Sequence, residues 1–132
     1  MPDALHVGLA GYLSRNRFSG DDEREDGALV LVIDDQYRVF CHPAQHGDLV
    51  FEARLMVLPD SGQQVYEVLR QAMQYAAGRL AQFADTLVLS RDESTLLLQQ
   101  RISADATGSE FEESLENFLN AIATWRRSLF VL

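Results

Sequence analysis

Three polar side chains near the middle of the sequence have the spacing of a possible metal site. His42 and His46 lie four residues apart, and Asp48 follows them. On a helix this spacing would place both imidazoles on one face, where they could bind a metal ion. Pro43 and Gly47 favour a loop instead, and the sequence contains no HExxH pattern. We therefore expect no metal at these residues.

Other patterns that support catalysis or cofactor binding are missing as well. The acidic run 21–26 lacks the alternating ligands, central glycine and final glutamate of an EF-hand. Gly8 and Gly11 lie in a helical pattern, so they do not form a phosphate-binding loop. No serine lies in a GxSxG motif, and Cys41 is expected to be a small buried residue. We expect no catalytic residue, no cofactor and no enzyme activity, although folding can assemble a catalytic site that leaves no sequence pattern.

The composition indicates a single domain, residues 1–132, with an acidic surface. Of its residues, 47% are hydrophobic, which is enough for a packed core. No apolar run could span a membrane and no secretory signal is present, so we expect a cytoplasmic protein without membrane insertion. The net charge of −9 disfavours nucleic acid as a partner. The charge would also keep a protein soluble if it exposed apolar patches or bound an aggregation-prone partner, but many small acidic proteins have no such partner.

Apolar periodicity predicts two helices before the last quarter of the chain. The first spans residues 4–17, with Asp3 as its expected N-cap, and His6 is expected to be exposed or to cap this helix. The second spans residues 63–79. Its apolar arc is wide enough to contact both its own sheet and a second chain. A single large core would explain the same width.

The last quarter predicts a third, long helix. Ser109 and Glu112 have the spacing of a capping box, in which each side chain satisfies a free backbone N–H at the helix start. Residues at three- and four-residue steps then share one face. These residues are Phe111, Leu115, Phe118, Leu119, Ile122, Trp125 and Leu129.

Five strands are predicted between these helices. The stretch 19–27 is expected to be a solvated loop, and the strand at 28–33 is apolar on both faces, which predicts an interior strand. The order of helix, three strands, helix, two strands and helix predicts an α+β fold with an antiparallel sheet. The expected strands are 28–33, 36–42, 49–58, 83–90 and 95–102.

Taken in order, four of these segments resemble the class I type III secretion chaperones, the Tir-chaperone (CesT-like) family. Residues 28–34 resemble the family's first strand and acidic turn, and residues 49–59 its third strand with the closing proline. Residues 87–98 resemble its second hairpin, and residues 115–129 its last helix. At 73–78 the chain reads MQYAAG, where family members often have a leucine-rich stretch followed by asparagine.

The resemblance implies a homodimer that binds the N-terminal region of a secreted effector and keeps it soluble. Effector strands would add to sheet edges, and effector apolar side chains would fill hydrophobic patches. No nucleotide hydrolysis is implied for this chain, because a separate secretion ATPase would release the effector.

The same resemblance leads to two sets of site residues, each of which could instead belong to the core. For effector binding we predict Leu9, Tyr12, Leu13, Phe40 and Val50, and for the dimer interface Val68, Met73, Tyr75 and Val88.

Two other functions remain open at this point. A regulatory protein of the same fold would bind a transcription regulator or another secretion component. An unrelated α+β enzyme or ligand sensor would have a closed pocket with perturbed ionisable groups.

Overall fold

The computed structural model describes residues 6–15, 24–25, 28–34, 36–79 and 83–130. The predicted α+β order is confirmed, with one short strand added before the others. The elements are α1 (Val7–Arg15), β1 (Arg24–Glu25), β2 (Ala28–Ile33), β3 (Tyr37–Pro43), the 3-10 turn η1 (Gln45–Gly47), β4 (Leu49–Val57), α2 (Gly62–Arg79), β5 (Thr86–Leu89), β6 (Thr95–Ile102) and α3 (Gly108–Phe130).

The described strands form one antiparallel sheet in the order β1-β2-β3-β4-β6-β5. The two-residue strand β1 pairs with the start of β2, within a stretch predicted to be a loop. That prediction is wrong at Arg24 and Glu25, because the charged run carries no strand pattern and only pairing with β2 makes it a strand. The strand predicted at 83–90 is also shorter than expected, because β5 covers four residues.

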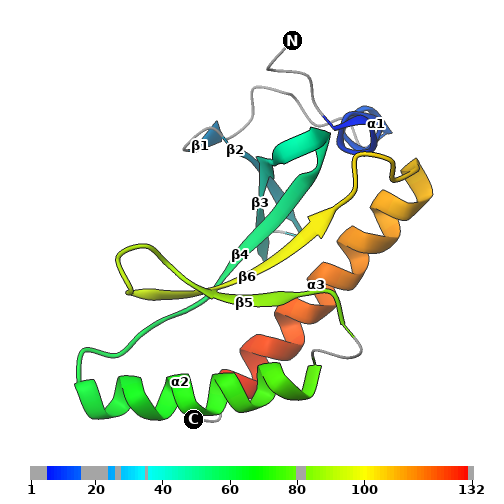
Figure 1. Cartoon of the computed structure of the whole chain (residues 1–132). Coiled ribbons are helices and arrows are strands. Elements are labelled where there is room, and N and C mark those ends of the chain that lie inside the picture. Colours follow the sequence, from blue (N-terminus) through cyan, green and yellow to red (C-terminus); the bar gives the residue numbers. More distant parts are fainter. Residues whose placement is uncertain (1–5, 16–23, 26–27, 35, 80–82, 131–132) are drawn as a thin grey trace.

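The three helices contribute to one core on one face of the sheet. Figure 1 shows α1 beside the start of α3 and α2 beside its end. The ring centroid of Phe51 on β4 lies 5.5 Å from those of Phe111 and Phe118 on α3. The long helix α3 therefore covers this face of the sheet. None of the described helices has the length and apolar character of a membrane span.

The first helix touches the third at Gly8. A Cβ atom at this position would lie 2.8 Å from the Cβ of Phe111, so only glycine permits this approach. His6 caps the helix, because its Nδ1 accepts a hydrogen bond from the Gly8 N–H at 3.0 Å. Its Nε2 donates to the Ser103 carbonyl at 2.6 Å, which ties the buried imidazole to the loop between β6 and α3. The capping role expected for His6 is confirmed, while Asp3 lies outside the described residues.

The capping box of the third helix lies two residues earlier than predicted. The Glu110 N–H donates to Thr107 Oγ1 at 3.1 Å, and the Thr107 N–H donates to Glu110 Oε1 at 2.8 Å. The Phe111 N–H donates to the Thr107 carbonyl, which makes Thr107 the N-cap. Both candidate pairs have the required spacing, so the sequence pattern alone did not separate them from each other.

Candidate protein-interaction surfaces

Two of the three residues considered for a metal site, His42 and Asp48, have other partners. His42 Nε2 lies 3.3 Å from Glu52 Oε1, across the pair β3 and β4. Asp48 accepts hydrogen bonds from Arg101 and from the Ala104 N–H, both at 2.8 Å, and these bonds hold the pKa of its carboxyl below the ordinary value. Within the described ranges no group of three or more His, Cys, Asp or Glu side chains could hold a metal ion. The acidic run 21–26 lies outside these ranges except for two residues of β1.

Cys41 is a core residue of β3, as predicted. Its side chain is buried, and this burial raises the pKa of the thiol to about 12. The thiolate is the reactive form of cysteine, and at neutral pH this thiol is protonated.

The predicted effector-binding residues lie on opposite faces of the sheet. Leu9 is 1% exposed and belongs to the main core, and Tyr12 packs on Phe111 with ring centroids 5.7 Å apart. Phe40 and Val50 lie on the other face, on neighbouring strands. Leu13 belongs to α1, but its side chain is outside the described part of the structure. Of the five, Phe40 and Val50 are thus brought together on one face of the sheet. The burial of Leu9 favours a role in the core, which the sequence left open.

The second face of the sheet carries a mixture of apolar and charged side chains. Val30, Val32 and Phe40 form a small cluster of their own, in which no described helix residue takes part. We call this surface the open sheet face. By strand register it consists of Val30, Val32, Arg38, Phe40, His42, Val50, Glu52, Arg54, Thr86, Val88, Leu97, Gln99 and Arg101.

The predicted dimer residues are divided between α2 and the open sheet face. Val68 is buried against the core, Met73 is 67% exposed, and Tyr75 packs edge-on against Trp125 at 4.7 Å. Val88 points to the open sheet face, since it pairs with Leu97. The wide apolar arc of α2 therefore has the core on one side and solvent on the other. Next to Met73, a hollow of about 290 Å³ separates α2 from β5.

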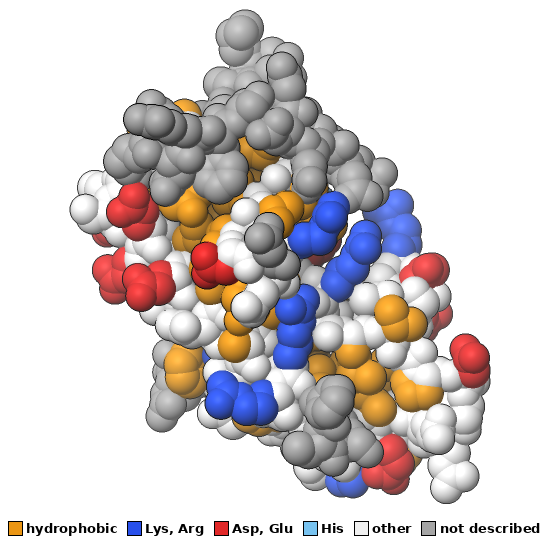
Figure 2. All heavy atoms as spheres, turned by 180° about the vertical axis from the view of Figure 1, so that it is seen from behind, with side chains coloured by type: hydrophobic (Ala, Val, Ile, Leu, Met, Phe, Trp, Pro, Cys, Tyr) orange, Lys and Arg blue, Asp and Glu red, His pale blue; other side chains and the backbone are white. Residues whose placement is uncertain are grey.

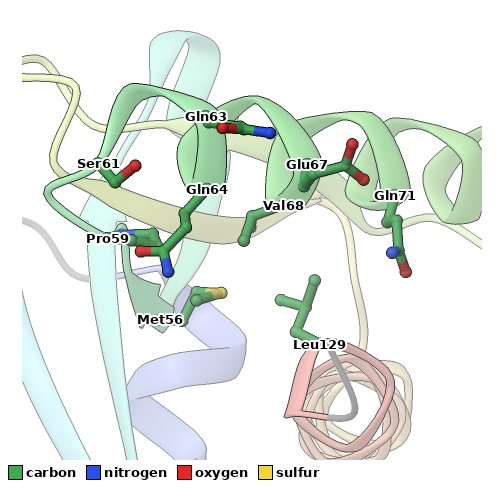
Figure 3. A pocket seen from close by; sticks show the side chains of 9 residues that line it. All are labelled: Met56, Pro59, Ser61, Gln63, Gln64, Glu67, Val68, Gln71 and Leu129. Atoms are coloured by element: carbon green, nitrogen blue, oxygen red, sulfur yellow. The ribbon is translucent and has the colours of Figure 1, made fainter.

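An open groove of about 800 Å³ lies between the first half of α2 and the end of α3. Figure 3 shows Met56, Val68 and Leu129 directed into it from β4, α2 and α3, with the amides of Gln64 and Gln71 along one side. An open groove with an apolar floor is suited to a protein segment, whereas small-molecule sites are usually more enclosed.

A buried ion pair joins Arg79 at the end of α2 to Asp85 just before β5, and no sequence pattern indicated it. Arg79 Nε and Nη2 donate to the two oxygens of Asp85 at 3.1 and 2.7 Å. Trp125 Nε1 donates to the same carboxylate at 3.0 Å, and the Arg79 guanidinium lies 3.9 Å from the ring centroid of Phe83. The ion pair thus fixes the end of α2 against the tryptophan of α3.

The ionisation of this pair follows from its hydrogen bonds. Burial alone would raise the pKa of Asp85, but the bonds from Arg79 and Trp125 and the arginine charge outweigh burial and lower it. The hydrogen bond to Asp85 likewise raises the pKa of Arg79, against the opposing effect of burial. Both groups are therefore charged at neutral pH. This perturbation has a structural cause and does not by itself indicate catalysis.

The basic side chains are unevenly placed on this acidic chain. All eleven are arginines. Figure 2 shows a band of them across one face, between two hydrophobic areas. Near the end of α3, Arg126 Nη2 donates to the Arg54 carbonyl at 2.8 Å, and its guanidinium lies 5.9 Å from the ring centroid of Tyr37.

The sequence profile of the Tir chaperone protein (CesT) family matches residues 13–126. The match begins in α1, includes every strand and ends within α3. The chain belongs to this family. Its membership confirms the resemblance found in the strand and helix patterns.

Solved structures, two of them named as type III secretion proteins, have the same fold as this CesT-family chain. A chain of the ExsC–ExsE complex matches it with a TM-score of 0.69 at 23% identity, over 92% of this chain and 90% of that one. The structure of the Yersinia pestis type III secretion chaperone SycH with a fragment of YscM2 matches with a TM-score of 0.58 at 19% identity, over 91% of this chain and 98% of that one. A chain of the ExoU–SpcU complex of Pseudomonas aeruginosa matches with a TM-score of 0.67 at 10% identity, over 89% of this chain and 94% of that one. A comparison with curated proteins finds no match.

Proposed function

We propose that the chain is a cytoplasmic type III secretion chaperone that acts as a single-domain homodimer. It would bind the N-terminal region of a secreted effector and keep that region soluble and competent for secretion. Family membership supports this function, and the structures similar in fold include chaperones in complex with effector or secretion proteins. The observation that carries the proposal is the sheet with one face packed under helices and apolar side chains on the other.

The exposed side of α2 supports the dimer. Tyr66 and Met73 are 65% and 67% exposed, and they lie seven residues apart on one stripe of the helix. A second copy would cover this stripe, the hollow beside β5 and the edge of Tyr75. We keep Val68 and Val88 in the proposed interface region as residues that support its shape.

The open sheet face supports effector binding. Phe40 and Val50 are the predicted residues that this face presents together, so we propose that they contact the effector directly. Tyr12 and Leu13 would contribute from the side of α1, and Leu9 would hold that helix in place from the core. An extended segment could also add to an outer strand of the sheet, where backbone groups are available for pairing.

We further propose that the chain performs no catalysis and that any energy for effector release comes from a separate secretion ATPase. The family is one of chaperones, and the exposed surfaces described above are suited to proteins. An enzyme of this size would instead be expected to enclose its substrate.

The proposal is tested by capture of partners from a native bacterial lysate, followed by mass spectrometry and light scattering. We expect two chains of 14.8 kDa each and one larger secreted protein, bound through its N-terminal region. Met73→Glu should convert the dimer to a monomer, because it buries a charge in the interface. Gln74→Glu is the matched control, since it adds the same charge at the next exposed position and should leave the dimer intact.

Capture of a transcription regulator in place of a secreted effector would move the protein to the regulatory function. A monomer that captures neither partner would contradict the proposal.

A further inference from the structure

The last residues of strand β6 have a neighbouring strand on one side only. β5 pairs with β6 from Leu96 to Gln99, whereas β4 pairs with it as far as Ile102. In Figure 1 the end of β6 rises away from the start of β5. Residues 100–102 therefore form an edge of the sheet that no other described strand covers. We call it the β6 edge.

The register shows which backbone groups face this edge. The Ser90 N–H donates to the Thr95 carbonyl, so these two residues form a hydrogen-bonded pair where the ladder of β5 and β6 begins. Bonded pairs alternate along an antiparallel ladder, so the backbone groups of Leu97 and Gln99 point toward β5. The N–H and C=O of Arg101 point in the same direction, where β5 has ended. One donor and one acceptor of β6 are thus available to another strand.

The buried ion pair explains why β5 begins late and leaves this edge uncovered. The strand predicted from the sequence begins at residue 83, and in the register of β5 it would place Ala84 opposite Arg101. The carboxylate of Asp85 instead binds Arg79 and the Trp125 N–H. These bonds hold Asp85 out of the line of the strand. The chain's own residues before β5 therefore do not occupy the β6 edge.

A groove runs between the β6 edge and α3. Gln100 and the residues before β5 line a hollow of about 520 Å³ together with α3. A second hollow of about 290 Å³ follows past Arg101 and Ile102. One stripe of α3, at three- and four-residue steps, lines both hollows. This stripe consists of Ser114, Asn117, Ala121 and Thr124. We call the two hollows together the β6 groove.

A buried amide lies in this groove. Gln100 is only 9% exposed, and in the alternation of β6 it lies on the covered face with Leu98 and Ile102. Its side chain lines the larger hollow and has no hydrogen-bond partner within the described residues. Buried polar groups in proteins are normally hydrogen-bonded. The amide of Gln100 is therefore available to a ligand that enters the groove.

The far end of the groove is acidic. The side chains of Asp105 and Glu110 line the smaller hollow. Arg101 lines the same hollow, but its guanidinium is bound to Asp48 at 2.8 Å. Neither Asp105 nor Glu110 has an ion-pair partner in the described part of the chain. A positive charge on a ligand would therefore be stabilised at this end.

We propose that the β6 groove binds an extended segment of the effector, which adds to β6 as a short strand. This inference rests on the proposed chaperone function and adds a contact site to it. An antiparallel segment in line with β5 would exchange two backbone hydrogen bonds with Arg101. Its residue opposite Gln100 would face α3 and carry an amide or hydroxyl side chain. Its N-terminal end would carry a lysine or arginine beside Asp105 and Glu110.

A second copy of the chain is a less suitable occupant of this groove. The proposed dimer uses the exposed stripe of α2 and the hollow next to Met73. That hollow and the β6 groove are both lined by Arg79 and Asp85, so the ion pair forms the wall between them. The Arg101 backbone lies on the far side of this wall from the proposed dimer interface. The effector segment and a second copy could thus be bound at the same time.

The first test is amide hydrogen exchange of the full-length protein, measured residue by residue by NMR. The N–H groups of Gln100 and Ile102 point toward β4 and should exchange slowly. The N–H of Arg101 should exchange at least about tenfold faster, because it has no strand partner. Slow exchange at Arg101 in the free protein would show that the edge is already occupied, and would overturn the proposal.

The second test adds the peptide Gly-Lys-Thr-Val-Asn-Gly with blocked ends, in an NMR titration at low salt. Its valine is designed to lie opposite Arg101 and its asparagine opposite Gln100. Methylation of the valine nitrogen should abolish binding, because that N–H donates to the Arg101 carbonyl. Methylation of the asparagine nitrogen is the matched control, since that N–H faces away from β6. Equal losses from the two methyl groups would overturn the proposal.

A third test exchanges the buried amide. The peptide Gly-Lys-Thr-Val-Leu-Gly should bind the wild type about tenfold more weakly than the asparagine peptide, because it leaves the Gln100 amide unpaired. Gln100→Leu should remove this preference, and circular dichroism establishes that the variant folds. Gln36→Leu is the matched control, because Gln36 is an exposed glutamine in the turn before β3. An equal effect of the two variants would contradict the proposal.

Further outcomes separate this inference from the proposed function. If the wild type captures a secreted effector but both methylated peptides bind alike, the proposed groove site fails and the chaperone function stands. If the peptides behave as expected but no effector is captured, strand addition stands and the chaperone function fails. If exchange at Arg101 is slow in the dimer and becomes fast in Met73→Glu, a second copy occupies the edge and the inference is overturned.

Discussion

The two faces of the sheet are made from the same strands but are completed in different ways. On β6, Leu96 and Leu98 are at most 1% exposed under the helices, whereas Leu97 between them is only half-buried on the open sheet face. The first face is completed by this chain's own third helix. The second has apolar side chains that no described helix covers. The contrast separates residues that specify the fold from residues available to a partner.

The largest loss of stability is expected when one large side chain is removed from the covered face. Phe118→Ala should lower the free energy of unfolding by about 3–5 kcal/mol, because Phe118 is fully buried and its loss leaves a cavity. Val50→Ala, on the open sheet face, should lower it by about 1 kcal/mol or less. Urea denaturation measures both values. Equal losses would mean that the second face is also part of the core.

A second test removes the buried carboxylate that links α2 to the covered face. Asp85→Ala leaves Arg79 and the Trp125 N–H without their acceptor, and loss of one partner of a buried ion pair costs about 3–5 kcal/mol. Glu67→Ala removes the partner of Arg70 from an exposed ion pair on the same helix, and it should cost at most about 1 kcal/mol. A small loss for Asp85→Ala would show that water replaces the carboxylate.

A smaller loss of stability is expected from a change at the start of α3. Thr107→Ala should lower the free energy of unfolding by about 1 kcal/mol, because it removes the N-cap hydrogen bond to the Glu110 N–H. Ser109→Ala changes the residue predicted from sequence and should have almost no effect. Thermal unfolding of the two variants compares them directly, and a larger loss for Ser109→Ala would restore the original assignment.

The smallest expected effect is the pH dependence that Asp85 contributes. Since its pKa is lower in the folded chain, its stabilisation is fully present above the pKa of the unfolded state, about 3.9. It is lost as the pH falls through the lower pKa of the folded state. Urea midpoints recorded from pH 6 to pH 3 should therefore fall less steeply for Asp85→Asn than for the wild type. Parallel curves would contradict the assigned pKa direction.

The sequence predicted the elements of the fold well because their patterns are local. Residues 28–33 are apolar throughout and end at a turn, and β2 has these same bounds. The predicted second helix begins one residue after the start of α2 and ends with it. These features depend on alternation, helical periodicity and turn residues, which a single sequence displays.

The missed features depend on contacts between distant parts of the chain. Arg79 ends α2, Asp85 precedes β5, and Trp125 joins them from α3, so no spacing pattern marks them. The His6 imidazole caps α1 because Ser103 holds its other nitrogen. The separation of Leu9 from Phe40 depends on which face of the sheet each element packs against. The placement of charged side chains on the open sheet face likewise requires the register of β3, β4 and β6.

Trp125 is the chain's only tryptophan, and its position turns it into a built-in optical probe. Its indole N–H is bound to Asp85, and Tyr75 of α2 packs against its ring, beside the hollow where a second copy would dock. A change in the hydration of that hollow shifts the emission of the indole. Assembly of two chains could thus be followed in real time with the unlabelled protein, even while an effector without tryptophan occupies the other face.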